Sequence, residues 1–160
     1  MDMYNWVVFL HVAVIFIFLI QHAAEIFVTF KLREQKEPEG IFATYSFLPN
    51  NNSRNLRITY SLIIITGAVA GFMSPWWKLG WMWTALGVMV ILWIVMNRWG
   101  GNYLTAVDAI TEQALKNKDD ESVIQKFRQD LKSRREPEIM TITSVIGMFI
   151  ILWLMMFKPF

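Results

Sequence analysis

Residues 9–30 form an apolar stretch that is long enough to cross a lipid bilayer, which takes about 20 residues in a helix. It nevertheless contains His11, Gln21, His22 and Glu25. An ionisable side chain within hydrocarbon costs roughly 2.5–3.5 kcal/mol on insertion scales, so each one needs a partner or a function. A helix turns about 100° per residue, which places His11, His22 and Glu25 on one face. The stretch therefore predicts a membrane-spanning helix whose polar face points toward protein.

This face continues as a stripe with the spacing of a helix-bundle seam. Its members are His11, Ile15, Phe18, His22, Glu25 and Thr29. The segment before the stripe contains Asp2 and no Lys or Arg, and His22-Ala23-Ala24 is a poor signal-peptidase site. We therefore expect this segment to be retained as the first helix of the protein.

The composition places the chain among membrane proteins and excludes several classes of site. Of its 160 residues 55% are hydrophobic and 15% aromatic, which is unusual for a soluble domain of this length. The net charge of +2 is too small to indicate a nucleic-acid partner. The chain contains no Cys, so disulfides, thiolate metal sites, cysteine nucleophiles and covalent haem attachment are excluded.

Hydropathy predicts an all-α, four-span bundle that forms a single membrane domain over residues 1–160. The spans are expected at about residues 4–30, 56–74, 81–97 and 139–157. A tight turn, which begins at Pro75 and is rich in Trp, should join the second and third spans at the membrane interface. The helices of such a bundle bury their polar groups against one another.

The first connection, residues 31–56, has the composition of a loop. Pro38, Gly40 and the polar run at 49–53 are turn and loop residues. Its apolar middle, residues 41–48, should lie in the membrane interface or tuck under the bundle.

The stretch 99–138 is polar and predicts a helical insert outside the membrane. Apolar residues recur at helical spacing in two runs, which residues 117–120 separate. The runs are Leu104, Val107, Ile110, Ala114, Leu115 and then Val123, Ile124, Phe127, Leu131. We expect two short amphipathic helices whose mixed charges face solvent.

The distribution of basic residues predicts the orientation. Thirteen of the fifteen Lys and Arg residues fall in or beside the two long connections, and only Lys78 and Lys158 fall on the other side. By the positive-inside rule, the connections should lie in the cytoplasm and both termini outside.

Gly67 and Gly71 form a GxxxG pattern in the second span. Small residues at this spacing allow close helix packing within lipid. The alternative is that they leave room for a flat ligand.

His22 and Glu25 should lie in a polar inner layer of the bundle. The depth of each residue, at about 1.5 Å per residue, gives its neighbours on the other spans. These are Ser61, Asn97, Arg98, Thr141, Thr143 and Ser144. Three interpretations remain open: a structural pair that closes the bundle with Arg98, a proton path or substrate contact, and a metal site.

His11 should lie beside small and apolar groups at the level of Ala68, without an evident partner. A hydrogen bond to a backbone carbonyl or to water is one interpretation. The other is an axial ligand of a b-type haem in the groove at Gly67 and Gly71, because such a haem needs an imidazole and space for a macrocycle. The second ligand would then be Met82, Met89, a water or a histidine of another protomer.

Several of these features resemble a known group. The Phe9-Leu10-His11 opening, the basic end at 31–34, the GxxxG span and the turn at Trp76-Trp77 are similar to small bacterial four-span membrane proteins of the copper-resistance D-like and protoporphyrinogen-oxidase-J-like type. The resemblance covers residues 9–98. It implies a bacterial inner-membrane location, and a role for His11 in serving a haem.

The predicted function is therefore that of a small integral membrane protein with a buried site on His11, His22 and Glu25, haem-binding and redox-linked. A scaffold or accessory subunit that binds a partner through residues 99–138 is the second hypothesis. A small transporter acting as a homo-oligomer, with Glu25 as a protonatable group, is the third. The lipid bilayer is the expected surrounding in each case.

Overall fold

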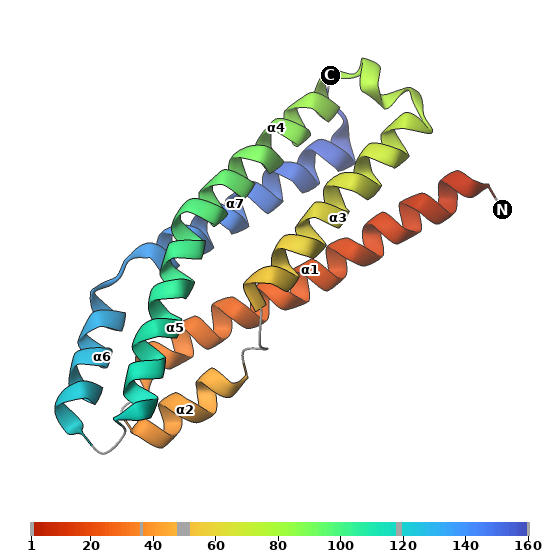
Figure 1. Ribbon diagram of the computed structural model, residues 1–160. Coiled ribbons are helices and arrows are strands. Elements are labelled where there is room, and N and C mark those ends of the chain that lie inside the picture. The colour runs from red at the N-terminus through yellow and green to blue at the C-terminus, as the bar shows by residue number, and fades with distance from the viewer. Residues whose placement is uncertain (1, 36, 48–51, 118–119, 160) are drawn as a thin grey trace.

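The computed structural model describes residues 2–35, 37–47, 52–117 and 120–159, and all elements in these ranges are helical (Figure 1). The four long helices are α1 (Met3–Glu34), α3 (Asn52–Phe72), α4 (Gly80–Val95) and α7 (Glu136–Phe157). Each of the four belongs to a helical segment that is long and apolar enough to cross a membrane. The predicted all-α class with four candidate spans is confirmed.

The long helices associate mainly as two pairs. α1 lies along α3, and α4 lies along α7 (Figure 1). Both termini and the 3₁₀ helix η1 (Pro75–Lys78) lie at one end of the bundle, and the shorter helices lie at the other end. Contacts between α1 and α7 help to join the pairs.

Large apolar side chains cover the outside of the bundle. Phe16 and Ile20 of α1 are 62% and 69% exposed, and Phe149 of α7 is 68% exposed. The buried positions of α1 include His11, His22, Glu25 and Thr29. The polar face of the first helix therefore points inward, as its spacing predicts. Its outward face is apolar, which suits contact with lipid.

The connection 31–56 differs from the predicted loop, because it contains the helix α2 (Pro38–Ser46). A proline begins the helix and Glu39 lies in its first turn, two features that favour a helix start. Ile41 is fully buried and Thr44 is nearly so. The apolar middle of the connection thus tucks under the bundle, one of the two predicted positions, and residues 48–51 lie outside the described part of the chain.

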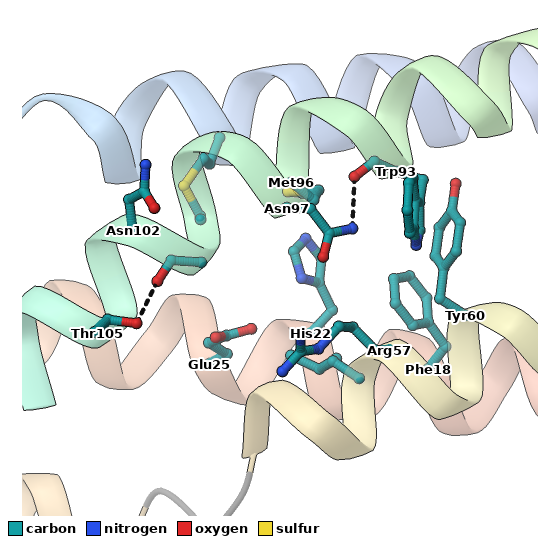
Figure 2. Close-up of a pocket in the computed structure, with 14 residues that line it drawn as sticks. Phe18, His22, Glu25, Arg57, Tyr60, Trp93, Met96, Asn97, Asn102 and Thr105 are labelled. Atoms are coloured by element: carbon teal, nitrogen blue, oxygen red, sulfur yellow. Dashed lines mark hydrogen bonds between the residues drawn. The ribbon is translucent and has the colours of Figure 1, made fainter.

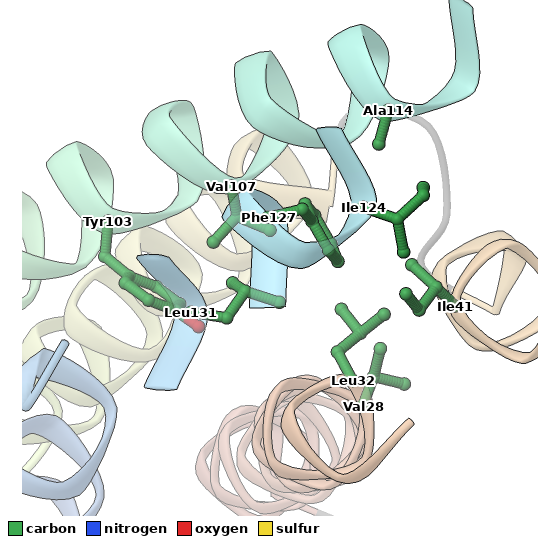
Figure 3. Packing of buried hydrophobic residues seen from close by; sticks show 9 residues of the cluster. All are labelled: Val28, Leu32, Ile41, Tyr103, Val107, Ala114, Ile124, Phe127 and Leu131. Carbon is green, nitrogen blue, oxygen red and sulfur yellow. The ribbon is translucent and has the colours of Figure 1, made fainter. Parts of the chain in front are cut away.

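The end of the bundle near α2 has its own hydrophobic core, which we call the end cluster (Figure 3). It joins α1 and α2 to α5 (Gly101–Lys116) and α6 (Glu121–Ser133). Its buried members are Val28, Leu32, Ile41, Tyr103, Val107, Ala114, Ile124, Phe127 and Leu131. Fully burying one large apolar side chain contributes about 1.5–3 kcal/mol, so this cluster stabilises the short helices that could not persist alone.

α5 and α6 are the two amphipathic helices predicted in the insert 99–138. Their apolar runs face the end cluster, although the side chains of Leu104 and Leu115 lie outside what the structure describes. The side chain of Asp120 caps α6 by accepting a hydrogen bond from the backbone N–H of Ser122 at 2.9 Å. The apolar faces of both helices are therefore used within the chain.

The helix shows no break at the boundary predicted between the third span and the insert. α4 continues without a break through a π-helical segment, η2 (Met96–Gly100), into α5. Gly100 and Gly101 weaken a helix by about 1 kcal/mol each relative to Ala but do not end it, because both retain helical backbone angles. The third span and the first insert helix form one long rod, whose π segment lies at their junction.

Arg33, at the end of α1, holds the junction of α6 and α7. Its guanidinium donates to the backbone oxygens of Lys132 and Arg134, each at 3.2 Å, and pairs with the carboxylate of Glu138. The Arg33 side chain is 16% exposed. A planar guanidinium can make these contacts together, which a lysine cannot.

Candidate functional site

His11 has a side-chain partner that the sequence did not suggest. Its Nδ1 lies 2.9 Å from Oγ1 of Thr66 on α3. The same Thr66 oxygen lies 2.7 Å from the backbone oxygen of Leu62, one turn earlier, to which its hydroxyl donates. The expectation that His11 lacks an evident partner is wrong, because depth matching placed it beside Ala68, two residues from its real partner.

The glycines of α3 make room for side chains of this chain. A Cβ on Gly67 would lie 3.0 Å from Cε1 of His11 and 3.6 Å from Nε2. A Cβ on Gly71 would lie 2.9 Å from Cε of Met82 and 3.1 Å from Nε1 of Trp77. The GxxxG pattern therefore permits close packing, and the space beside it is filled.

The surroundings of His11 do not fit a haem. The imidazole lies against the backbone of α3 at Gly67, where the macrocycle would need open space. Met82 packs at Gly71, and Met89 is buried with Val14 and Ile63. Both candidate methionines thus belong to the packing of the bundle, and we derive no chemistry through a haem.

The half of the bundle nearer α2, α5 and α6 contains a half-open cavity of about 260 Å³ with several polar lining residues, which we call the chamber. Four parts of the chain line it: α1, α3, the rod formed by α4, η2 and α5, and the start of α7. The side chains of His22 and Glu25 point from α1 toward the rod (Figure 2). The other polar members are Arg57, Tyr60, Asn97, Asn102 and Thr105. The volume far exceeds the roughly 10–15 Å³ that one water needs.

His22 and Glu25 are buried, and each keeps an unsatisfied polar atom. Nε2 of His22 and Oε1 of Glu25 have no hydrogen-bond partner within the described ranges. One face of the His22 ring stacks on the ring of Phe18, with 5.5 Å between the ring centroids and 8° between the ring planes. An unpartnered buried polar group costs about 1–3 kcal/mol, so these atoms are suited to a bound molecule.

The chamber contains only part of the predicted polar layer. Asn97 lines it, and Thr141 joins His22 and Glu25 around a small adjoining cavity. Ser61 is exposed and donates to the backbone oxygen of Arg57, and Thr143 does not line the chamber. Ser144 is buried and donates to the backbone oxygen of Thr141, one turn earlier.

The prediction of Arg98 as part of the buried site is wrong. Arg98 is exposed and does not line the chamber. It lies in the π segment η2, whose residues Met96, Asn97 and Gly100 face the chamber instead. A π turn takes one more residue than an α turn, which changes the direction of the side chains that follow it.

Four polar residues of the chamber were not predicted: Arg57, Tyr60, Asn102 and Thr105. Asn102 and Thr105 reach it only because α5 extends the third span, and the phenol of Tyr60 donates to the backbone oxygen of Met89 at 2.6 Å. The stretch from 81 to 115 contains no proline, which was the signal that could have revealed the two α5 residues. A π segment has no comparable signal in one sequence.

The arrangement does not provide a metal site from side chains. Within the part of the chain that the structure describes, no three His, Cys, Asp or Glu residues are grouped closely enough to hold an ion. His22 and Glu25 supply two ligands, whereas a protein zinc site normally uses three or four.

No protein-family model, curated protein or solved structure matches the chain.

Proposed function

We propose that this chain is an integral membrane protein that binds a small polar group in the chamber, where His22 and Glu25 hold it. The observation that carries this proposal is that both residues line one cavity, and each keeps a buried polar atom without a hydrogen-bond partner. An ionisable residue within a membrane span is expensive, and it commonly marks a binding or transport site.

The chemistry of the chamber favours hydrogen bonding over covalent catalysis. Glu25 can accept a hydrogen bond, and His22 can donate or accept one according to its tautomer. The amide of Asn97 donates to the backbone oxygen of Trp93, and the hydroxyl of Thr105 donates to that of Gly101. Asn102 also lines the cavity. These groups suit a ligand with oxygen or nitrogen atoms.

The proposal includes an orientation. Thirteen of fifteen basic residues belong to the end of the bundle that carries α2, α5 and α6, or to its connections. The positive-inside rule then puts this end, and the chamber beside it, on the cytoplasmic side, with both termini outside. A bacterial inner membrane is the corresponding location.

The proposal can be tested by identifying what the protein retains from its membrane. Wild type, Glu25→Gln and His22→Ala would be extracted with native lipids in polymer discs, and their bound small molecules compared by mass spectrometry. Glu34→Gln is the matched control, because Glu34 is on the same helix but its side chain is 67% exposed.

The expected result is a species that is enriched in wild type and in Glu34→Gln, and depleted in the two chamber variants. Loss of one buried hydrogen bond should reduce its retention about fivefold or more. Equal amounts of every small molecule in all four folded preparations would contradict the proposal.

A further inference from the structure

A second cavity extends the polar chamber toward the opposite end of the bundle. Its volume is about 300 Å³, and Phe18, Tyr60 and Met96 line both cavities. α1, α3, α4 and α7 all contribute to this second cavity, which we call the slot. Ser144 and Tyr60 are its polar members, and their hydroxyls are bonded to backbone oxygens of Thr141 and Met89.

The two cavities together have the form of a site for an amphiphile. The chamber presents unsatisfied polar atoms, whereas the slot presents apolar surface. Because they share these three lining residues, the two cavities are neighbours along the bundle. The combined volume falls within the range of about 300–1,000 Å³ that is usual for ligand sites.

The slot is as long as one leaflet of a membrane. Along α7 it runs from Ser144 to Met155, eleven residues, which at about 1.5 Å per residue is roughly 16 Å. The hydrocarbon of one leaflet is about 15 Å deep, half of the roughly 30 Å core. An extended chain of about this length would fill the slot along α7.

The charges of the chamber favour an uncharged head. Glu25 and Arg57 are its two side chains of opposite formal charge. A phosphate or an ammonium group would be attracted by one of these side chains and repelled by the other, so the pair selects neither sign of charge. A hydroxyl can donate to Oε1 of Glu25 and accept from His22, and it introduces no charge.

We infer that the chamber and the slot together bind a single-chain amphiphile, with a hydroxyl-bearing uncharged head on His22 and Glu25 and its chain in the slot. This inference rests on the proposed function and names the class of its ligand. Apolar surface gives little driving force within lipid, because the bilayer is as apolar as the slot. The affinity therefore comes from the head, and the slot selects the form of the chain.

The test uses a monoacylglycerol with a photoreactive diazirine in its chain, added to the full-length protein in phosphatidylcholine nanodiscs. Crosslinked residues are mapped by mass spectrometry. We expect labelling of slot residues such as Met148, in addition to lipid-facing residues such as Met156, which is 71% exposed. Two further probes carry the same chain: one is a headless alkyl ester and the other a diacyl phosphatidylcholine.

Two variants separate the head from the chain. Met148→Trp fills the slot and should reduce slot labelling about fivefold or more, whereas Met156→Trp on the outer face of the same helix should leave it unchanged. Glu25→Gln should also reduce it about fivefold or more through the lost acceptor. The headless ester and the phospholipid should label only lipid-facing residues.

Three outcomes would overturn the inference. Equal labelling of the slot by all three probes would identify ordinary lipid contact, and labelling restricted to outer residues would show that no chain enters. A third outcome is retention of a polar species without a chain, which depends on Glu25 and is insensitive to Met148→Trp. That result would leave the proposed function standing and refute the amphiphile alone.

Discussion

The contact between His11 and Gly67 should make a small substitution in α3 unusually costly. In Gly67→Ala the new Cβ would lie 3.0 Å from Cε1 of His11, closer than ordinary van der Waals contact. The imidazole must then shift, although its Nδ1 is held 2.9 Å from Thr66. The substitution therefore acts on one ring and its hydrogen bond.

The magnitude is a balance of opposing effects. Replacing Gly by Ala in a helix gains about 1 kcal/mol of intrinsic propensity. Overpacking costs roughly 1–3 kcal/mol, and loss of the hydrogen bond costs about 0.5–1.5 kcal/mol. We expect Gly67→Ala to destabilise the protein by about 1–2 kcal/mol, which lowers Tm by about 2–4 °C per kcal/mol for a chain of this size.

A double-mutant cycle with His11→Ala isolates this contact. Without the imidazole nothing crowds the new methyl group, so Gly67→Ala should become neutral or stabilising by up to about 1 kcal/mol. Thr66 keeps its bond to the oxygen of Leu62, so His11→Ala does not leave that hydroxyl unpaired. The assay is thermal unfolding in one detergent, with Gly87→Ala as control because a Cβ on Gly87 meets no atom within 4 Å.

The cycle also provides the result that would refute this reasoning. If Gly67→Ala is as harmless as Gly87→Ala in wild type, the imidazole does not lie against the α3 backbone. Equal destabilisation by Gly67→Ala with and without His11 would assign the crowding to another neighbour.

Three further predictions concern the end of the bundle and its orientation. Arg33→Ala and Arg33→Lys should both increase hydrogen exchange at the junction of α6 and α7, because neither can make all three contacts, and unchanged exchange would show that the junction holds without the guanidinium. Hydrogen bonds from the Ser122 hydroxyl and then from its backbone N–H lower the pKa of Asp120, so this cap is complete above the usual carboxyl pKa and is lost as the pH falls through the lowered value. Asp120→Ala should therefore increase exchange in the first turn of α6 at neutral pH and remove its acid dependence, and a wild-type profile in the variant would contradict this. In the cysteine-free chain, Lys158→Cys should react with an impermeant maleimide on intact cells, whereas Glu39→Cys should react only after permeabilisation; the reverse pattern would invert the orientation.

The fold was largely predictable because its main signals are local. Length and hydropathy are enough to predict four long helices, and the spacing of His11, His22 and Glu25 predicts which face of α1 is buried. The helix α2 was missed because Pro38 and Gly40 also occur in loops. Only burial of Ile41 in the end cluster decides between the two.

The site was less predictable because its partners depend on helix geometry over long distances. Depth matching assumed straight α-helices that end where charge begins, which placed Arg98 in the chamber and left out Asn102. Because of the π segment η2 and the continuation into α5, Arg98 lies outside the chamber and Asn102 lines it. The Thr66 partner of His11 was missed by a depth error of two residues, less than one helical turn.

The central claim is that His22 and Glu25 hold a bound polar group, and the imidazole of His22 can report it directly. The chain has two histidines, so selective ¹⁵N labelling of histidine gives one set of signals for His22 and one for His11. Spectra would be recorded in native-lipid discs and after exchange into synthetic phosphatidylcholine discs. We predict that the Nε2 signal of His22 changes between the two preparations, that the His11 signals remain, and that Glu25→Gln removes the change. Identical His22 signals in both preparations of the wild-type protein would contradict the account.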